Sequence, residues 1–396
     1  MALQDVLDKQ ANSIEYVLHT HGIRIQVDGG RLSPRLAHFH LLLPPGVRPQ
    51  QLSPFVQEIA SVLGVQSCRL QSGESGIHLE VPRPDPVPVR LLPLVQRVAD
   101  IVPPVTATLG LDCEGTPLLL RLNSPDVDSV FISGGPRAGK SSLLKGMSLS
   151  LSLHNSPERV RLLLISLDGD DAAFGGLENL PHLACPLANG PADALLSLRW
   201  AERTLSRRSQ LDADELTFDD GDDALLDSLS MGAEEPDLIV MIDGAERLGT
   251  AGNARFQSEA LPLLNRLLAD GPKHGIHLVL SSAVAALPGI NSGWGARISG
   301  WVHSPEAARL ATGVKGSGAH SLLGEGDFVI SLNAELIRFQ AGSITDGEVR
   351  KALELIRQGA MFPQPSAKSE DLSTEDQWYG YVSNEPVPLR RLWSGQ

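Results

Sequence analysis

Residues Val130–Leu144 read VFISGGPRAGKSSLL, and this stretch decides the fold of the chain. A β-branched and aromatic run leads into Gly134, four residues follow, and Gly139-Lys140-Ser141 opens a segment of good helix formers. This order is the strand–loop–helix pattern of a phosphate-binding P-loop. The two glycines permit backbone angles that turn successive N–H groups toward a phosphate, and the helix directs its partially positive end at the same anion.

The spacing of this motif therefore predicts an ATP site that also holds Mg²⁺. We expect Lys140 to reach the β- and γ-phosphates and the Ser141 hydroxyl to ligate Mg²⁺. A chance match in a glycine-rich loop is the competing interpretation, and the strand before the motif and the helix after it argue against it. The predicted nucleotide-binding residues are Gly134, Gly135, Pro136, Arg137, Ala138, Gly139, Lys140, Ser141 and Ser142.

A second motif completes the predicted site, because the apolar run Leu238–Ile242 ends in the carboxylate of Asp243. This is the Walker B arrangement, in which Asp243 holds Mg²⁺ opposite Ser141. A buried strand that ends at an ordinary Asp-Gly turn is the alternative. The predicted metal ligands for Mg²⁺ are thus Ser141 and Asp243.

Hydrolysis also needs a group that activates the attacking water. Many ATPases place a glutamate directly after the Walker B aspartate, but this chain has Gly244 there, and Glu246 is the nearest carboxylate that follows. We therefore predict Lys140, Asp243 and Glu246 as the catalytic residues and expect slow or absent hydrolysis.

The composition is typical of a soluble globular protein, with 396 residues, 42% hydrophobic and 20% charged. This length allows two or three domains. Sparse aromatics (4%) argue against a platform on which bases stack. No apolar run is long enough to cross a bilayer, and the first residues lack a signal-peptide pattern, so we expect a cytoplasmic protein without membrane insertion. The three cysteines and eleven histidines show no disulfide or zinc spacing.

The net charge of −14 is concentrated in one segment. Residues 209–237 hold eleven carboxylates and no Lys or Arg, which leaves −3 for the rest of the chain. We interpret this segment as an acidic insertion in a solvated surface loop. A local basic face elsewhere stays open, although no sequence feature demonstrates one.

The order of apolar runs predicts three regions: a small α+β domain at 1–102, an α/β domain at 103–360 and a polar C-terminal tail at 361–396. In the second, strands alternate with helix-length segments, which indicates a mostly parallel sheet covered on both faces. Its expected strands are Val130–Ile132, Arg161–Ile165, Leu238–Ile242, His277–Leu280, Ala296–Ser299, Phe328–Leu332 and Leu336–Phe339. The small domain is expected to hold a helix through Val17, strands at 23–27, Phe39–Leu43, Cys68–Leu70 and Ile77–Val81, and a helix over Leu52–Leu63.

Further motifs lie outside the P-loop, namely Pro44–Val47, Leu109–Asp112, Gly115–Pro117, Ser156–Ile165, Leu180–Leu183, Gly275–Leu280 and Leu322–Phe328. Together with the P-loop they resemble the FtsK/SpoIIIE DNA-translocase ATPases over roughly Ile14 to Ile356. The resemblance implies a RecA-like P-loop motor preceded by the small α domain of that family. It also implies a homo-oligomeric ring, of the size of a hexamer, that moves double-stranded DNA. Arg297 and Arg309 fall at family arginine positions, which implies that they reach a neighbouring subunit's nucleotide.

The chain departs from this family at several positions. Gly244 replaces the catalytic glutamate, Ser282-Ala283-Val284 replaces Thr-Gln-Arg, and Ser166-Leu167-Asp168 replaces Asp-Pro-Lys. We recognise neither the family's membrane-spanning N-terminus nor its winged-helix DNA reader. Gly134-Gly135-Pro136 and Asp243-Gly244 also resemble degenerate type VII secretion ATPase modules. A second hypothesis therefore stays open: an ATP-binding subunit of a secretion or defence complex, with little ATPase activity, that meets a protein partner through its acidic insertion or tail.

Overall fold

The computed structural model describes residues 3–73, 76–169, 173–215, 235–250, 254–290, 293–359 and 390–392. The chain divides into two compact units, one of Met1–Val89 with Asp112–Gly115 and the other of Arg90–Leu111 with Thr116–Gln396. No helix among the described residues is both long enough and apolar enough to span a bilayer.

The first unit is an antiparallel sheet with helices. Its strands β1 (Gln26–Leu32), β2 (Leu36–Leu42), β3 (Arg69–Gly73) and β4 (Gly76–Pro82) lie in the order β1-β2-β4-β3. Helices α1 (Leu3–Thr20) and α2 (Val56–Leu63) contribute Ile14, Leu18 and Ile59 to its core. The predicted elements are present with shifted ends. The first strand spans Gln26–Leu32 rather than 23–27, β2 starts at Leu36 rather than Phe39, and β3 extends to Gly73. The 3-10 turns Pro49–Gln51 and Ser53–Phe55 precede α2, so the helix starts at Val56 rather than Leu52.

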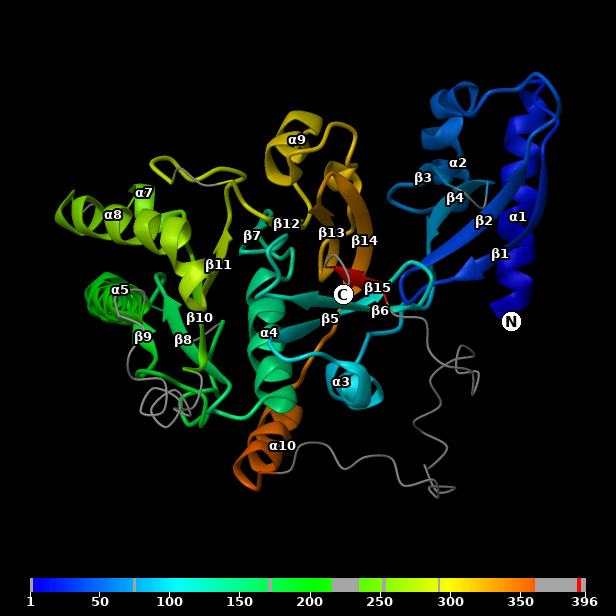
Figure 1. Ribbon diagram of the computed structural model, residues 1–396. Coiled ribbons are helices and arrows are strands. Elements are labelled where there is room, and N and C mark those ends of the chain that lie inside the picture. Colours follow the sequence, from blue (N-terminus) through cyan, green and yellow to red (C-terminus); the bar gives the residue numbers. More distant parts are fainter. Residues whose placement is uncertain are drawn as a thin grey trace. The chain divides into compact units, whose positions relative to one another are not determined.

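The second unit is built on a large mixed sheet (Figure 1). Among the described residues, eleven strands follow the order β15-β6-β5-β14-β13-β12-β7-β11-β10-β8-β9. The half from β12 to β9 is parallel, whereas β12, β13 and β14 pair in antiparallel fashion, as do β5 and β6. Its strands are β5 (Thr106–Asp112), β6 (Pro117–Arg121), β7 (Ser129–Ser133), β8 (Val160–Ser166), β9 (Ala188–Asn189), β10 (Asp237–Asp243), β11 (Ile276–Ser282), β12 (Ala296–Ser299), β13 (Asp327–Leu332), β14 (Glu335–Ala341) and β15 (Arg390–Leu392).

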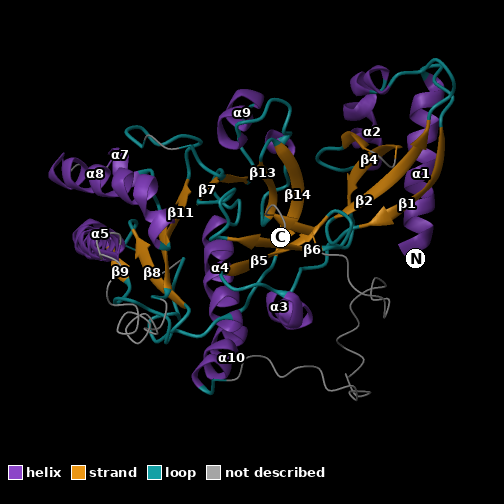
Figure 2. Ribbon diagram, in the orientation of Figure 1, coloured by secondary structure: helices purple, strands orange, loops and turns teal. Residues whose placement is uncertain are grey.

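Helices cover both faces of this sheet. Each strand contributes to both helix layers, because successive side chains of a strand point to opposite faces. Val130 and Ile132 of β7 pack with one core cluster, and Phe131 between them packs with the other. The first cluster includes side chains of α3 (Leu91–Val98), α4 (Lys140–His154) and α10 (Asp346–Arg357). The second includes α5 (Gly190–Glu215) and α8 (Ala254–Asp270), which lie side by side (Figure 2). Short helices α7 (Arg247–Thr250) and α9 (Pro305–Thr312) follow β10 and β12.

The seven strands predicted for this region are all present, within one or two residues of their expected ends. The sequence predicts a surface loop for the acidic segment 209–237, but its described ends are regular structure. Helix α5 runs to Glu215, and β10 starts at Asp237. Residues 216–234 lie outside the described part of the chain, as do residues 361–389 and 393–396 of the predicted tail. Residues 390–392 add the parallel strand β15 to the sheet edge at β6.

Candidate nucleotide site

The predicted P-loop connects β7 to α4 and has the unusual backbone that the glycines were expected to supply. The φ angles are 151° at Gly134, 61° at Arg137 and 100° at Gly139. A Cβ at Gly139 would lie 2.8 Å from the Gly326 nitrogen, so this position needs glycine for space as well as for conformation. Pro136 and Arg137 form the exposed tip of the loop, whereas Ala138 is buried.

Two neighbouring segments brace this loop through backbone hydrogen bonds. The Gly135 N–H donates to the Trp301 carbonyl at 2.7 Å, just after β12. Before β13, the N–H groups of Glu325 and Gly326 donate to the carbonyls of Arg137 and Ala138, at 3.0 and 2.8 Å. Sequence reasoning had no signal for Trp301, because its carbonyl acts through strand packing and not through a motif.

Lys140 and Ser141 begin α4 at the mouth of the loop. The Lys140 Nζ donates to the carbonyls of Gly134 and Gly135, at 2.8 and 3.2 Å. Burial lowers the pKa of Lys140, and the negative charges of Glu246, Asp243 and Asp168 oppose that shift. Burial and these three carboxylates therefore act on the pKa of the lysine in opposite directions. Ser142 is exposed on the next position of the helix.

Asp243 ends β10 and lies against α4. The Ser141 Oγ donates to the Asp243 Oδ2 at 2.9 Å, so the two predicted Mg²⁺ ligands are adjacent. Asp243 is only 8% exposed, and burial raises its pKa, which the Ser141 hydrogen bond and the Lys140 charge partly oppose. Mg²⁺ prefers such hard oxygen donors and keeps several water ligands, so this pair fits a cation shared with phosphates.

The carboxylates beyond Asp243 are arranged less simply. Glu246 Oε2 accepts a hydrogen bond from the Ala283 N–H at 2.9 Å, which turns this predicted catalytic residue toward the loop after β11. Asp168, directly after β8, accepts a hydrogen bond at Oδ1 from Arg247 Nε at 2.5 Å. Sequence reasoning did not select Asp168 as a site residue, although the unusual Ser166-Leu167-Asp168 segment was the available signal.

The two arginines implied to act on a neighbouring subunit have different surroundings. Arg297 on β12 donates from Nη1 to the Leu310 carbonyl at 3.2 Å, and burial lowers its pKa. Arg309 on α9 is exposed. Arg297 therefore supports its own subunit's fold, and Arg309 is the one whose charge faces solvent.

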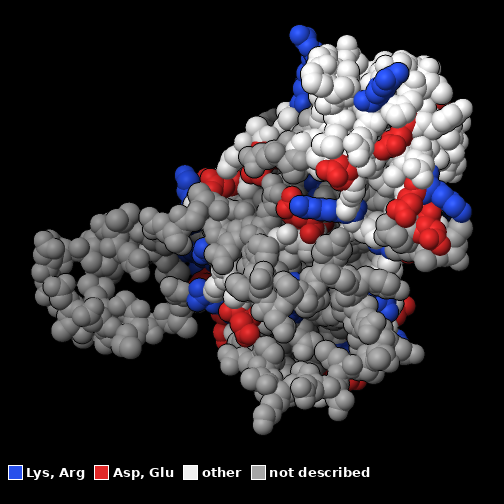
Figure 3. Space-filling view, turned by 90° about the vertical axis from the view of Figure 1, so that its right-hand side faces the viewer, with Lys and Arg blue, Asp and Glu red and all other residues white. Residues whose placement is uncertain are grey.

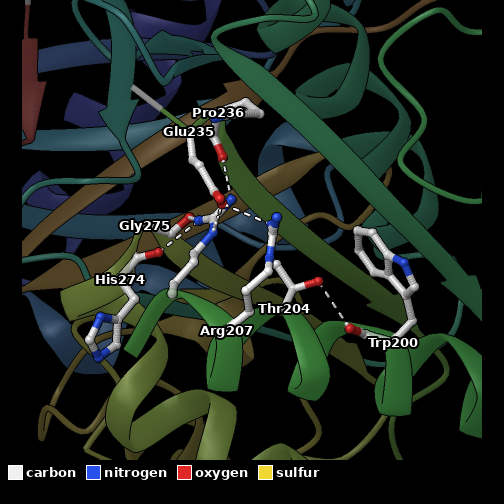
Figure 4. A network of polar contacts seen from close by, with 8 residues as sticks. Trp200, Thr204, Arg207, Glu235, Pro236, His274 and Gly275 are labelled. Atoms are coloured by element: carbon white, nitrogen blue, oxygen red, sulfur yellow. Dashed lines mark hydrogen bonds and ion pairs between the residues drawn. The ribbon is translucent and has the colours of Figure 1, made fainter. Parts of the chain in front are cut away.

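A separate cavity of about 460 Å³ lies at the amino end of β10, at the other end of this strand from Asp243. Its lining includes Trp200, Thr204 and Leu238, and also Arg207, Arg208, Glu235 and Pro236 of a polar network (Figure 4). Arg208 donates to Glu235 Oε2 (2.8 Å) and to the carbonyls of Pro236 (2.7 Å), His274 (2.7 Å) and Gly275 (3.1 Å). Arg207 also donates to Glu235, at 3.0 Å, so this member of the predicted acidic insertion is ion-paired.

Comparison with known families gives two matches. A model described as "FtsK/SpoIIIE family" matches residues 96–288, and one described as "FtsK alpha domain" matches residues 2–83. The P-loop, the Walker B strand and the loop after β11 all lie inside the first match.

Among curated proteins, the chain is 26% identical over 390 residues to the DNA translocase FtsK of Leptospira interrogans, a match that covers 93% of this chain and 39% of that protein. It is also 26% identical to the DNA translocase SftA of Bacillus subtilis, covering 89% of this chain and 37% of that protein. The chain thus spans about two fifths of the length of these relatives.

Solved structures share the fold. The cytoplasmic domain of the type VII secretion ATPase EccC of Thermomonospora curvata matches with a TM-score of 0.55 at 22% identity, over 71% of this chain and 35% of that one. The pCW3 conjugation coupling protein TcpA matches with a TM-score of 0.56 at 14% identity, over 88% of this chain and 99% of that one. The predicted α/β P-loop ATPase fold is confirmed.

Proposed function

The chain belongs to the FtsK/SpoIIIE family through its two matched domains, and on this premise we propose that it is an ATP- and Mg²⁺-binding, ring-forming translocase of double-stranded DNA with weakened hydrolysis. One observation supports the nucleotide site above all others. The Ser141 hydroxyl lies 2.9 Å from the Asp243 carboxylate, at the mouth of a braced loop that also holds the Lys140 ammonium.

Each residue has a role that follows from its chemistry. We assign the phosphate contacts to the start of α4 and to the N–H groups of Arg137 and Gly139, because the Gly135 N–H donates to the Trp301 carbonyl and Pro136 has no N–H. Lys140 exchanges its bonds with the carbonyls of Gly134 and Gly135 for phosphate oxygens, while Ser141 and Asp243 hold Mg²⁺. Ser141 and Asp243 would hold this cation, which when bound would supply positive charge beside the phosphates.

Weak hydrolysis follows from the carboxylates. Gly244 has no side chain to orient a water, and Glu246 is bonded to the Ala283 N–H. Because the base or water-orienting group contributes roughly 10²–10⁴-fold to such reactions, its displacement slows turnover without preventing ATP binding.

The family relation, rather than the charge of the surface, supports DNA as the substrate. The relatives bear the name DNA translocase, and the charge outside residues 209–237 is close to neutral. On the face drawn in Figure 3, described Lys and Arg side chains are mixed with Asp and Glu and form no gathering of one sign. We propose that six copies of the chain form a ring in the cytoplasm and contact the backbone of the DNA duplex. In this ring, Arg309 would reach the nucleotide bound by a neighbouring copy.

The first test measures ATP affinity and steady-state turnover with and without duplex DNA. We expect wild-type chain to bind ATP in a Mg²⁺-dependent manner and to turn over slowly, with stimulation by DNA that decreases steeply as salt is raised. Lys140→Ala removes the phosphate contact and should abolish both activities. Lys145→Ala, a partly buried lysine on the same helix, is the matched control and should leave both unchanged. Turnover that survives in Lys140→Ala would contradict the assignment of the site.

Gly244 and Ala283 also favour the second function, a nucleotide-binding structural or partner-recruiting subunit of a secretion or defence complex. A site of this kind stabilises the folded chain by binding ATP even without turnover. Tight, Lys140-dependent binding with no turnover, with or without DNA, would select this alternative over the motor.

A further inference from the structure

The space beside Gly244 is filled from the neighbouring strand. Gly244 has a φ of +77°, and a Cβ built on it would lie 3.1 Å from Asp168 Oδ2 and 3.2 Å from Asp168 Cγ. The Asp168 carboxylate therefore lies beside the point where a side chain at position 244 would begin, closer than an ordinary van der Waals contact, so a side chain there would crowd it.

Backbone pairing fixes this arrangement. Strands β8 and β10 are parallel neighbours, with Ser166 opposite Asp243, and the Leu167 N–H donates to the Asp243 carbonyl at 3.0 Å. Asp168 follows directly at the carboxyl edge of the sheet, where ligands of α/β folds bind. Its position thus derives from two rigid strands rather than from a loop alone.

Arg247 orients the Asp168 side chain. Its Nε donates to Asp168 Oδ1 at 2.5 Å, which leaves Oδ2 as the oxygen that faces Gly244. The Asp168 side chain is 33% exposed, so water reaches it. The Glu246 carboxylate accepts the Ala283 N–H and is thereby directed toward the loop after β11.

We propose that Asp168 supplies, from β8, the water-orienting carboxylate that position 244 lacks on β10, with Arg247 as its positioning residue. This inference rests on the proposed ATP site. In the reaction, the water oxygen bonds to the γ-phosphorus while the bond from that phosphorus to the β–γ bridging oxygen breaks. ADP leaves with the bonding electron pair, and Asp168 accepts the water proton and returns it to solvent.

Turnover of matched variants gives the first readout. Asp168→Asn keeps the size of the side chain and removes its basicity, so we expect turnover at saturating ATP to decrease about 100-fold. Glu246→Gln tests the carboxylate that the sequence predicts, and a loss as large as that of Asp168→Asn would contradict the assignment to Asp168. Arg247→Gln should lower kcat to an intermediate level with KM unchanged, as expected when the carboxylate is present but poorly oriented.

Nucleotide affinity gives a second readout that does not depend on turnover. A carboxylate that faces the γ-phosphate repels it, so Asp168→Asn should tighten binding of a non-hydrolysable ATP analogue about five-fold and leave ADP affinity unchanged. A residue with only a structural role would behave differently, because its loss would weaken both ligands and lower the melting temperature.

Several outcomes would overturn the inference. These are an Asp168→Asn variant that turns over within about three-fold of wild type, equal losses of ATP-analogue and ADP affinity, and a wild-type chain that binds ATP without hydrolysing it. The last result leaves ATP binding standing, whereas a wild-type chain that binds no ATP removes the proposed function as well. If Asp168→Asn lowers turnover as expected but DNA does not stimulate the wild-type chain, only the translocase assignment is contradicted.

Discussion

At the scale of single residues, Asp243 shows that a side chain placed to bind a cation can lower the stability of the nucleotide-free chain. Its carboxylate is 8% exposed and accepts a hydrogen bond from a neutral hydroxyl, that of Ser141. The Lys140 ammonium bonds to loop carbonyls instead. A buried charge compensated in this incomplete way lowers the stability of the nucleotide-free chain, as is common where a site is built to receive a cation.

We therefore expect Asp243→Asn to raise the melting temperature of the nucleotide-free chain at pH 8. Burial raises the pKa of Asp243, so the folded chain binds this proton more tightly than the unfolded chain. Stability is then lost as pH rises through the raised pKa, and asparagine removes that loss while it still accepts from Ser141. Calorimetry at pH 5 and pH 8 should show a gain that is larger at pH 8. A lower melting temperature at both pH values would contradict this account.

The residue scale also shows what sequence could predict of the site. Lys140, Ser141 and the loop glycines follow from local spacing, and Asp243 follows from its place after an apolar strand. Asp168 and Trp301 do not, because their roles depend on which strands are neighbours in the sheet. The orientation of Glu246 toward Ala283 likewise results from the pairing of β10 with β11.

At the scale of elements, Arg208 joins three parts of the fold. It lies on α5, and its guanidinium bonds to Glu235 and Pro236 before β10 and to His274 and Gly275 before β11, four residues that Figure 4 labels. Its side chain is 10% exposed, whereas that of Arg207 is 62% exposed and pairs with Glu235. Adjacent arginines thus form a buried and an exposed ion pair with the same carboxylate.

This contrast gives a matched prediction. Arg208→Met should destabilise the chain by about 3 kcal/mol, because it removes the guanidinium bonds to Glu235 and to three carbonyls, although Glu235 keeps Arg207 and the Gly275 carbonyl keeps the Leu238 N–H. Arg207→Met should cost less than about 1 kcal/mol, since exposed pairs are screened by water. Urea unfolding with unchanged m-values measures both. Equal losses in the two variants would show that the network does not hold the starts of β10 and β11.

A strand or helix could be predicted from the sequence when its apolar residues follow a clear pattern. The parallel strands β7, β8, β10 and β11 are five to seven residues long and have central apolar runs of three to five residues, which separate them from the helices around them. The short strands β9 and β15, with two and three residues, carry no such run and arise because a sheet edge is available to pair with. The acidic segment was interpreted from charge alone, which gave no sign that Glu235 would pair with the two arginines.

At the scale of the whole molecule, the proposed ring requires each nucleotide to lie between two copies of the chain. A ring uses head-to-tail contacts, so one face of each subunit meets a different face of the next. Arg309 is exposed on α9, as an arginine that acts on a neighbour must be. Arg297 differs, because it donates to the Leu310 carbonyl of its own chain.

Mixing two inactive variants tests this arrangement. Lys140→Ala lacks its own phosphate contact but keeps Arg309, and Arg309→Ala has the reverse defect. We expect each alone to turn over at least about 100-fold more slowly than wild type. In an equal mixture about one quarter of neighbouring pairs combine an intact P-loop with an intact arginine, so turnover should return to at most that fraction.

The same mixture with Arg297→Ala in place of Arg309→Ala provides the control. Loss of the bond to Leu310 should lower the melting temperature of Arg297→Ala, and mixing does not repair a fold defect within one chain. Restored turnover with Arg309→Ala but not with Arg297→Ala would therefore place the nucleotide between subunits, with Arg309 as the residue supplied by the neighbour. If turnover returns in neither mixture, each chain completes its own nucleotide site, and turnover does not require a ring.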